Sequence, residues 1–207
     1  SYFTLAVYSE SVFLAVTILF FYYLKKEQFW HAALFVSLAI LTRFVGIALL
    51  PLFAWFVVRR FGSKPISFLL LLLSSGGLFL YACINKWYFG SYSYFFFEQV
   101  SFDATKHLII PFQETVGILI VLVQNWRTVK LDFMMSSGWN ALFTAFALLI
   151  IIFGMRKVAW RYIVFSTISL LVFASLSWGI SNARYTLSVF PLYMILAQIK
   201  YKSVIFG

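Results

Sequence analysis

The chain has few of the residues that build thiol, metal and nucleotide sites. It contains one cysteine, Cys83, which excludes an internal disulfide and a Cys-x-x-Cys metal or redox motif. The two histidines, His31 and His107, match no metal-ligand spacing. A Gly-rich phosphate loop and a Gly-x-Ser-x-Gly nucleophile motif are also missing. A carboxylate-bound divalent metal is left open.

Charge is equally scarce. Charged residues make up 11% of the 207 residues and hydrophobic residues 63%, with a mean hydropathy of +0.96. This balance predicts a multi-pass integral membrane protein. The net charge of +10 does not indicate nucleic-acid binding, because the basic residues form short clusters between apolar runs.

The first residues also lack an initiator methionine and the features of a signal peptide. The chain opens on Ser1 without an initiator methionine, and no basic region or cleavage site precedes the first apolar run. We therefore expect the chain to be a fragment whose upstream part is missing.

Apolar runs predict an all-α fold, a polytopic transmembrane helical bundle. A spanning helix needs about 20 apolar residues. Seven segments are expected: 11–24, 29–42, 44–59, 66–84, 138–155, 162–178 and 186–199. The first two are short, which implies a thinned bilayer or a cavity open to the outer face. With no repeat or linker, we expect one domain over residues 1–207.

The basic residues lie at alternate junctions between these segments. Cytoplasmic loops collect Lys and Arg. Alternation places all four clusters on one side: Lys25 and Lys26; Arg59, Arg60 and Lys64; Arg156, Lys157 and Arg161; Lys200 and Lys202. This topology makes residues 85–137 an outer loop. Within it, residues 116–123 are apolar but too short to span, so we expect a helix lying in the interface.

Arg43 is the most informative residue. It lies between apolar stretches, where a cation is costly and marks a functional site by default. The basic pairs on either side predict a hairpin of two short helices with Arg43 at its outer tip. The guanidinium suits a lipid phosphate, which it can bind bidentately. The alternative is a structural ion pair within the bundle.

Three further outer-side groups are candidates, each with a plain structural alternative. Glu10 either favours the helix start that Ser9 caps, or serves a cavity by orienting a sugar, binding a metal or pairing with Arg43. Arg184 either anchors the last helix at the interface or forms a second phosphate clamp, and Pro191 is expected to kink that helix. The carboxylates of Glu98 and Asp103 in the outer loop are either solvated or catalytic.

Several stretches resemble motifs of PIG-V-type mannosyltransferases. Residues 8–13, Tyr-Ser-Glu-Ser-Val-Phe, resemble their Tyr-Ser/Thr-Glu-Ser-Leu-Phe motif. Residues 38–51 resemble their Leu-Ala-x-Leu-Thr-Arg-x-x-Gly-x-x-x-Leu-x-Pro hairpin, and residues 183–192 their closing Arg-Tyr and Phe-Pro-Leu pattern. Residues 88–99 are similar to their loop ending in Gln, though Tyr92 replaces the usual Pro.

The resemblance implies the GT-C fold and a polyprenyl-phosphate sugar as donor. It makes Glu10 an accessory acidic residue, because the principal acid of these families lies upstream of this motif. The resemblance therefore implies that the chain is the C-terminal part of a larger enzyme and inactive alone. It implies that the donor phosphate and substrate are bound by Arg43, Thr42, Gln99, Arg184 and Tyr185. Protein O-mannosyltransferases and aminoarabinose transferases share the hairpin and closing helix, so the subfamily is left open.

The expected function is therefore transfer of a sugar, mannose above all, from a polyprenyl phosphate to an acceptor hydroxyl on the outer or lumenal face. The expected partners are the lipid-linked donor, membrane lipids and a glycan or glycolipid acceptor, with no nucleic acid. The membrane would be the plasma membrane of a prokaryote or the endoplasmic reticulum of a eukaryote. The rival functions are a transporter or lipid flippase with a buried arginine, and an O-antigen ligase or polymerase.

Overall fold

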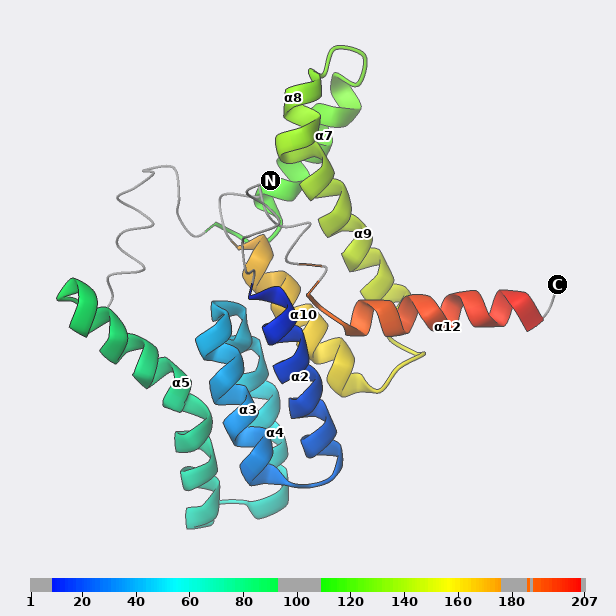
Figure 1. The fold of residues 1–207 in the computed structure, drawn as a ribbon. Helices are drawn as coiled ribbons and strands as arrows, with labels where there is room; N and C mark the ends of the chain where they lie inside the picture. The colour runs from blue at the N-terminus through cyan, green and yellow to red at the C-terminus, as the bar shows by residue number, and fades with distance from the viewer. Residues whose placement is uncertain (1–8, 93–108, 176–185, 187, 206–207) are drawn as a thin grey trace. The chain divides into compact units, whose positions relative to one another are not determined.

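The computed structural model describes residues 9–92, 109–175, 186 and 188–205, and the regular secondary structure in these ranges is entirely helical (Figure 1). The predicted all-α class is therefore confirmed. The chain forms two compact units, residues 1–97 and 98–207. The expected single domain stays a prediction.

The first unit contains an antiparallel run of helices. These are α2 (Glu10–Lys25), α3 (Phe29–Thr42), the 3-10 helix η1 (Phe44–Ala48), α4 (Leu49–Phe61) and α5 (Pro65–Phe89). Figure 1 shows α2, α3 and α4 side by side, with the first half of α5 packed against α3 and α4. Phe20 of α2 meets Phe53 of α4, with ring centroids 6.2 Å apart, and both rings are fully buried. The core thus lies between the three short helices.

The crossing of α3 and α5 depends on small side chains. A Cβ added at Gly77 would collide with the backbone oxygen of Ser37, and one at Gly76 would lie 3.5 Å from the Ser37 hydroxyl oxygen. Close backbone approach at glycine and serine is typical of helix packing in membranes. Gly77 therefore fixes where α5 crosses its neighbour.

The second unit contains α7 (Gln113–Gln124), the single turn α8 (Leu131–Phe133), the π-helical η2 (Met134–Gly138), α9 (Trp139–Gly154), α10 (Trp160–Ala174) and α12 (Pro191–Ile205). α7 packs against α9, and the N–H of Phe112 donates to the carbonyl of Ala174 at the end of α10 (3.0 Å). A Cβ at Gly154 would lie 2.5 Å from Ile195, so α9 and α12 also cross closely.

Most predicted segments match helices to within a few residues, with three differences. The third segment is divided by η1 before α4 begins. The fourth extends through Asn85–Phe89, which were assigned to the outer loop, and ends before Gly90 at φ +77°. The kink predicted at Pro191 was wrong: proline is the first residue of α12, where its missing N–H costs no helical hydrogen bond.

Only one described helix, α5, is both long and apolar enough to cross a bilayer. Its most apolar 18 residues have a mean hydropathy of 2.0. The helices that match the other predicted segments are shorter, so the polytopic arrangement stays a prediction. The interfacial helix expected at 116–123 is helical, as α7, while its position relative to a membrane stays a prediction.

Candidate functional site

Arg43 lies where α3 stops. Its backbone is extended (φ −155°, ψ 138°), so the chain leaves the helix at this residue, although its N–H still donates to the carbonyl of Ala39 (3.0 Å). The hydroxyl of Thr42 donates to the same carbonyl at 2.8 Å. Thr42, a predicted substrate-binding residue, thus caps its own helix beside Arg43.

The turn after Arg43 is tightly packed. The N–H of Gly46 donates to the carbonyl of Arg43 (2.9 Å), and Val45 and Ala48 are buried. A Cβ at Gly46 would lie 2.5 Å from the carbonyl carbon of Ala39, too close for any side chain. Gly46 therefore allows η1 to fold back onto α3 and holds the backbone of Arg43 in place. The predicted hairpin is present in the structure, with its turn extended to Ala48.

The side chain of Arg43 forms an ion pair with Glu10, the first residue of α2. Arg43 Nη1 and Glu10 Oε1 are 2.8 Å apart, and the side chains are only 12% and 20% exposed. The two residues are 33 positions apart in sequence and meet because α2 and α3 are antiparallel neighbours. The structure thus brings together the two residues singled out from different motifs.

Both charges of this pair are favourably placed relative to the helix dipoles. Glu10 begins α2, where the dipole is positive, and Arg43 follows the last turn of α3, where it is negative. The predicted cap by Ser9 was wrong, because Ser9 occupies the N-cap position without a side-chain cap hydrogen bond. Glu10 is therefore held by the arginine and the helix end, without help from Ser9.

Three predicted site residues, Gln99, Arg184 and Tyr185, lie outside the described residues, as do Glu98, Asp103 and His107. Within the described ranges, no group of three His, Cys, Asp or Glu side chains could hold a metal ion. His31 stacks on Tyr23 instead, with ring centroids 4.9 Å apart. The described part of the candidate site is the Glu10–Arg43 pair and its supporting turn.

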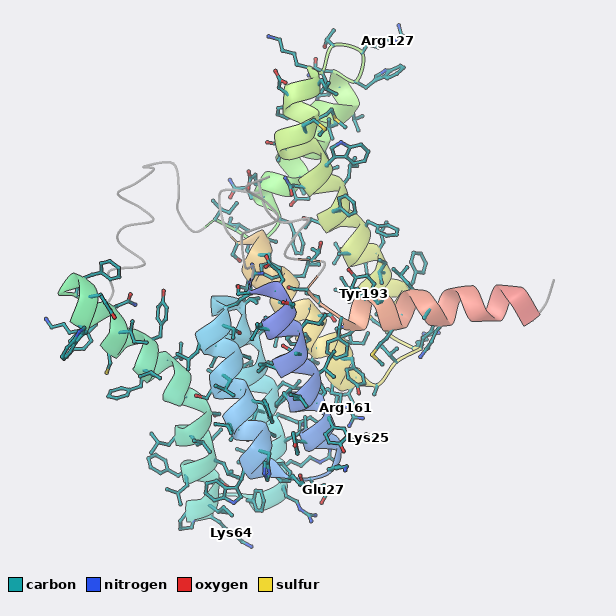
Figure 2. The ribbon with its side chains drawn as sticks, viewed as in Figure 1. Lys25, Glu27, Lys64, Arg127, Arg161 and Tyr193 are labelled. Carbon is teal, nitrogen blue, oxygen red and sulfur yellow. The ribbon has the colours of Figure 1, made fainter. Side chains whose placement is uncertain are left out.

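Sequence reasoning missed a second ion pair, at the opposite end of the same helices. Arg60 Nη2 lies 3.1 Å from Glu27 Oε2, and both side chains are about 60% exposed, at 60% and 63%. Figure 2 shows Glu27 with Lys25 and Lys64 at this end of the first unit. The last turn of α4 therefore returns to the loop between α2 and α3, as the alternation of basic clusters predicted.

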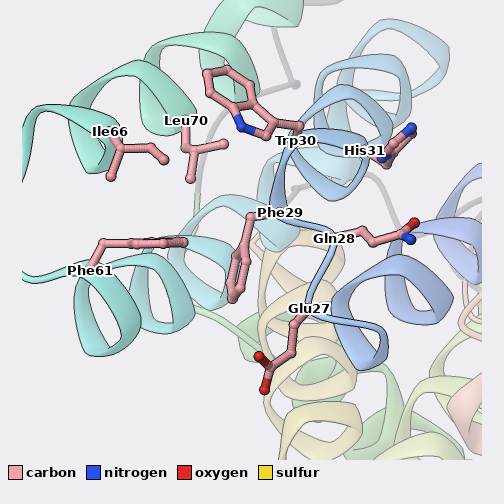
Figure 3. Close-up of a pocket in the computed structure, with 8 residues that line it drawn as sticks. All are labelled: Glu27, Gln28, Phe29, Trp30, His31, Phe61, Ile66 and Leu70. Atoms are coloured by element: carbon pink, nitrogen blue, oxygen red, sulfur yellow. The ribbon is translucent and has the colours of Figure 1, made fainter.

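A pocket of about 290 Å³ opens beside this exposed pair, and it was also not predicted (Figure 3). Its residues come from the start of α3, the end of α4 and the start of α5. It lies at the other end of α3 from Arg43, so the pocket and the buried ion pair are separate features.

No family model, curated protein or solved structure matches this chain.

Proposed function

We propose that this chain belongs to a polytopic membrane glycosyltransferase that uses a polyprenyl-phosphate sugar and binds the donor phosphate at Arg43. The observation that carries the proposal is the Glu10–Arg43 ion pair: a guanidinium mostly shielded from water, held at the hairpin end opposite the basic clusters. The resemblance of residues 8–13 and 38–51 to PIG-V-type motifs supplies the substrate class.

The exposed apolar surface supports the membrane placement. Only 22% of the most apolar stretch of α5 is buried, whereas the core helix of a soluble protein would be mostly buried. Large apolar side chains such as Phe68, Leu72 and Phe79 are 59–74% exposed along it. A continuous apolar surface of this kind requires lipid or a partner. At 25 residues and about 1.5 Å per residue, α5 reaches across a hydrocarbon core.

The arrangement of charge supports the orientation. Five cations lie at one end of the first unit: Lys25, Lys26, Arg59, Arg60 and Lys64. Arg43 and Glu10 lie at the other end. By the positive-inside rule the first end is cytoplasmic, so the buried pair is on the outer or lumenal side. The helices α2 to α4, of 13–16 residues, are short for a full span, which would place the pair below the outer headgroups.

Arg43 would act on the leaving group. The acceptor hydroxyl attacks the anomeric carbon, the bond from that carbon to the phosphate oxygen breaks, and the electron pair leaves with the polyprenyl phosphate. The phosphate changes from a singly charged diester to a monoester that gains a second negative charge. A fixed cation therefore binds the transition state more tightly than the ground state. The hydroxyl proton passes to a carboxylate.

Glu10 would link the binding of the donor phosphate at Arg43 to the transfer of the sugar. Its carboxylate pairs with the guanidinium that a phosphate would also bind, so the two anions compete for one cation. Donor binding would then replace the carboxylate and release Glu10 toward the acceptor, where it can orient the sugar. In the absence of donor the pair keeps the cation neutralised, which lowers the cost of its burial.

The experiment measures sugar transfer in membranes containing the complete protein, with a labelled polyprenyl-phosphate mannose. Arg43→Ala should lose about 100-fold or more in turnover per folded molecule, the scale of one preorganised stabilising group. Arg43→Lys keeps the charge but loses the bidentate fork, so we expect partial activity. Arg60→Ala removes the exposed arginine of the other pair and should leave transfer near the parent rate.

Two results would contradict the proposal. If folded Arg43→Ala transfers sugar near the parent rate, Arg43 serves only the structural pair. If the parent moves labelled lipid across the membrane without a new glycosidic bond, the protein is a flippase or transporter. Cysteine labelling tests the orientation separately. In a Cys83→Ser background, Ser91→Cys should be modified from outside and Ser63→Cys only after permeabilisation.

A further inference from the structure

The pocket at the basic end has apolar and aromatic walls. Phe29 and Phe61 meet edge to face with ring centroids 5.1 Å apart, and Leu70 is fully buried behind them. Figure 3 shows Trp30, Ile66, Leu70 and Phe61 surrounding one hollow, while Gln28 and His31 point to the other side of α3. Trp30 is 51% exposed, which places its indole at the open side of the pocket.

The residues beside these walls are positively charged. Lys64 precedes Ile66 by two positions, Arg60 precedes Phe61, and Lys26 precedes Glu27. Glu27 is the only acidic residue between positions 11 and 97, and Arg60 already pairs with it. A side-chain hydrogen bond with Tyr22 raises the pKa of Lys26 above its ordinary value. The opening of the pocket therefore attracts anions, while the apolar interior of the pocket accepts a hydrocarbon chain.

Size decides how much of a ligand enters. At about 290 Å³ the pocket lies at the lower end of the range for ligand pockets, roughly 300–1,000 Å³. It can hold one part of an acyl chain but not a whole lipid. A ligand that fits must have a chain for the pocket and an anionic group outside it.

We infer that this pocket binds an anionic phospholipid, with part of one acyl chain between Trp30, Phe61 and Leu70 and the headgroup phosphate at Lys64 and Lys26. Basic clusters where helices meet the cytoplasmic leaflet bind anionic headgroups in this way. The inference rests on the membrane placement proposed above and does not depend on sugar transfer. The site is distinct from Arg43, which lies at the opposite end of α3.

The test uses Trp30 as the reporter, in a variant whose other six tryptophans are phenylalanine. It is placed in nanodiscs containing a small fraction of phospholipid brominated on one acyl chain, either phosphatidylglycerol or phosphatidylcholine. We expect stronger quenching of Trp30 by the anionic lipid at equal mole fraction. Lys64→Gln and Lys26→Gln should each weaken that preference about fivefold, the scale expected for the loss of one cation near an anionic surface.

Lys130→Gln is the matched control, because it removes an exposed cation of the second unit and should change nothing. If the tryptophan replacements disturb folding, native mass spectrometry of the parent protein should find retained phosphatidylglycerol that Ile66→Trp, which fills the pocket, expels. Equal quenching by both lipids, or an unchanged preference in Lys64→Gln and Lys26→Gln, would overturn the inference. Arg43→Ala should bind the phospholipid as the parent does, which separates this site from the proposed donor site.

Discussion

The first unit carries two glutamate–arginine ion pairs, one at each end of the same helices. Glu10 and Arg43 are 2.8 Å apart with side chains 20% and 12% exposed, whereas Glu27 and Arg60 are 3.1 Å apart and about 60% exposed. The charges are alike and the distances differ by 0.3 Å, so burial is the main difference. An exposed pair is screened by water, but a buried pair interacts in a low dielectric and leaves a costly charge behind when one partner is lost.

The difference in burial gives the two ion pairs of the first unit different chemical uses. The exposed pair has four further cations at the same end and can lose either partner to water at little cost. The buried pair can exchange its carboxylate only for another anion, because an unpaired guanidinium shielded from water would be unfavourable. A buried pair of this kind is suited to recognising a phosphate, and an exposed pair is suited to holding a loop beside a charged surface.

The largest expected effect on stability is at the buried pair. Arg43→Ala leaves Glu10 buried without its cation and should lower the free energy of unfolding by about 3 kcal/mol, the lower end of the range for such losses. Replacing both residues by apolar ones, Arg43→Met with Glu10→Leu, should recover most of this loss. Unfolding in mixed micelles measures both. If the single and double variants are equally unstable, the pair is not the source of the effect.

The sequence predicted the helices of this protein better than their ends. Apolar runs locate the segments because each helix must cover its backbone with apolar side chains. They do not mark where a helix stops: α5 continues five residues beyond its apolar run and ends at Gly90, where φ is +77°. Gly90 is a recognisable C-terminal signal that could have placed this boundary. The 3-10 turn at Phe44–Ala48 had no comparable signal, because its residues are as apolar as the helices around it.

The site was predicted in part for the same reason. A cation in an apolar run identifies Arg43 from sequence alone, and pairing with Glu10 was one of the alternatives. The Glu27–Arg60 pair and the adjoining pocket depend on how α4 returns to the α2–α3 loop, which is a tertiary fact. Gly76-Gly77 in an apolar helix is a signal for close packing that could have indicated the α3–α5 crossing.

The turn at the buried end should be less tolerant of added volume than an open glycine elsewhere. Gly46→Ala places a Cβ 2.5 Å from the Ala39 backbone, which cannot move aside without disturbing α3. We expect a loss of about 1–3 kcal/mol. Gly117 in α7 is the control, because no atom lies within 4 Å of an added Cβ. Gly117→Ala should stabilise by about 0.5–1 kcal/mol through helix propensity. A neutral Gly46→Ala would mean that the turn can relax.

Gly62, at the basic end of the first unit, is constrained by its backbone conformation and not by close packing. Gly62 follows α4 with φ +61°, and nothing lies within 4 Å of an added Cβ. With ψ at −139°, Gly62 lies outside the left-handed α region, and Gly62→Ala should cost about 1–3 kcal/mol from backbone conformation alone. Gly62→Asn should cost about as much as Gly62→Ala, because asparagine tolerates positive φ mainly in the left-handed α region. Thermal unfolding of the two variants compares them directly, and a clearly smaller loss for Gly62→Asn would show that this residue shifts into the left-handed α region.

The smallest expected effect is at the exposed ion pair. Arg60→Ala should lower the free energy of unfolding by about 0.2–1 kcal/mol, because both side chains are mostly in solvent. The loss should nearly vanish in 1 M salt, where the Debye length is about 3 Å and a surface pair is screened. The loss caused by Arg43→Ala should largely persist in the same salt, since a pair mostly shielded from water is screened much less. Unfolding of both variants at low and high salt is the measurement. If Arg60→Ala costs as much as Arg43→Ala, or if salt reduces both losses equally, then burial is not what distinguishes the two ends.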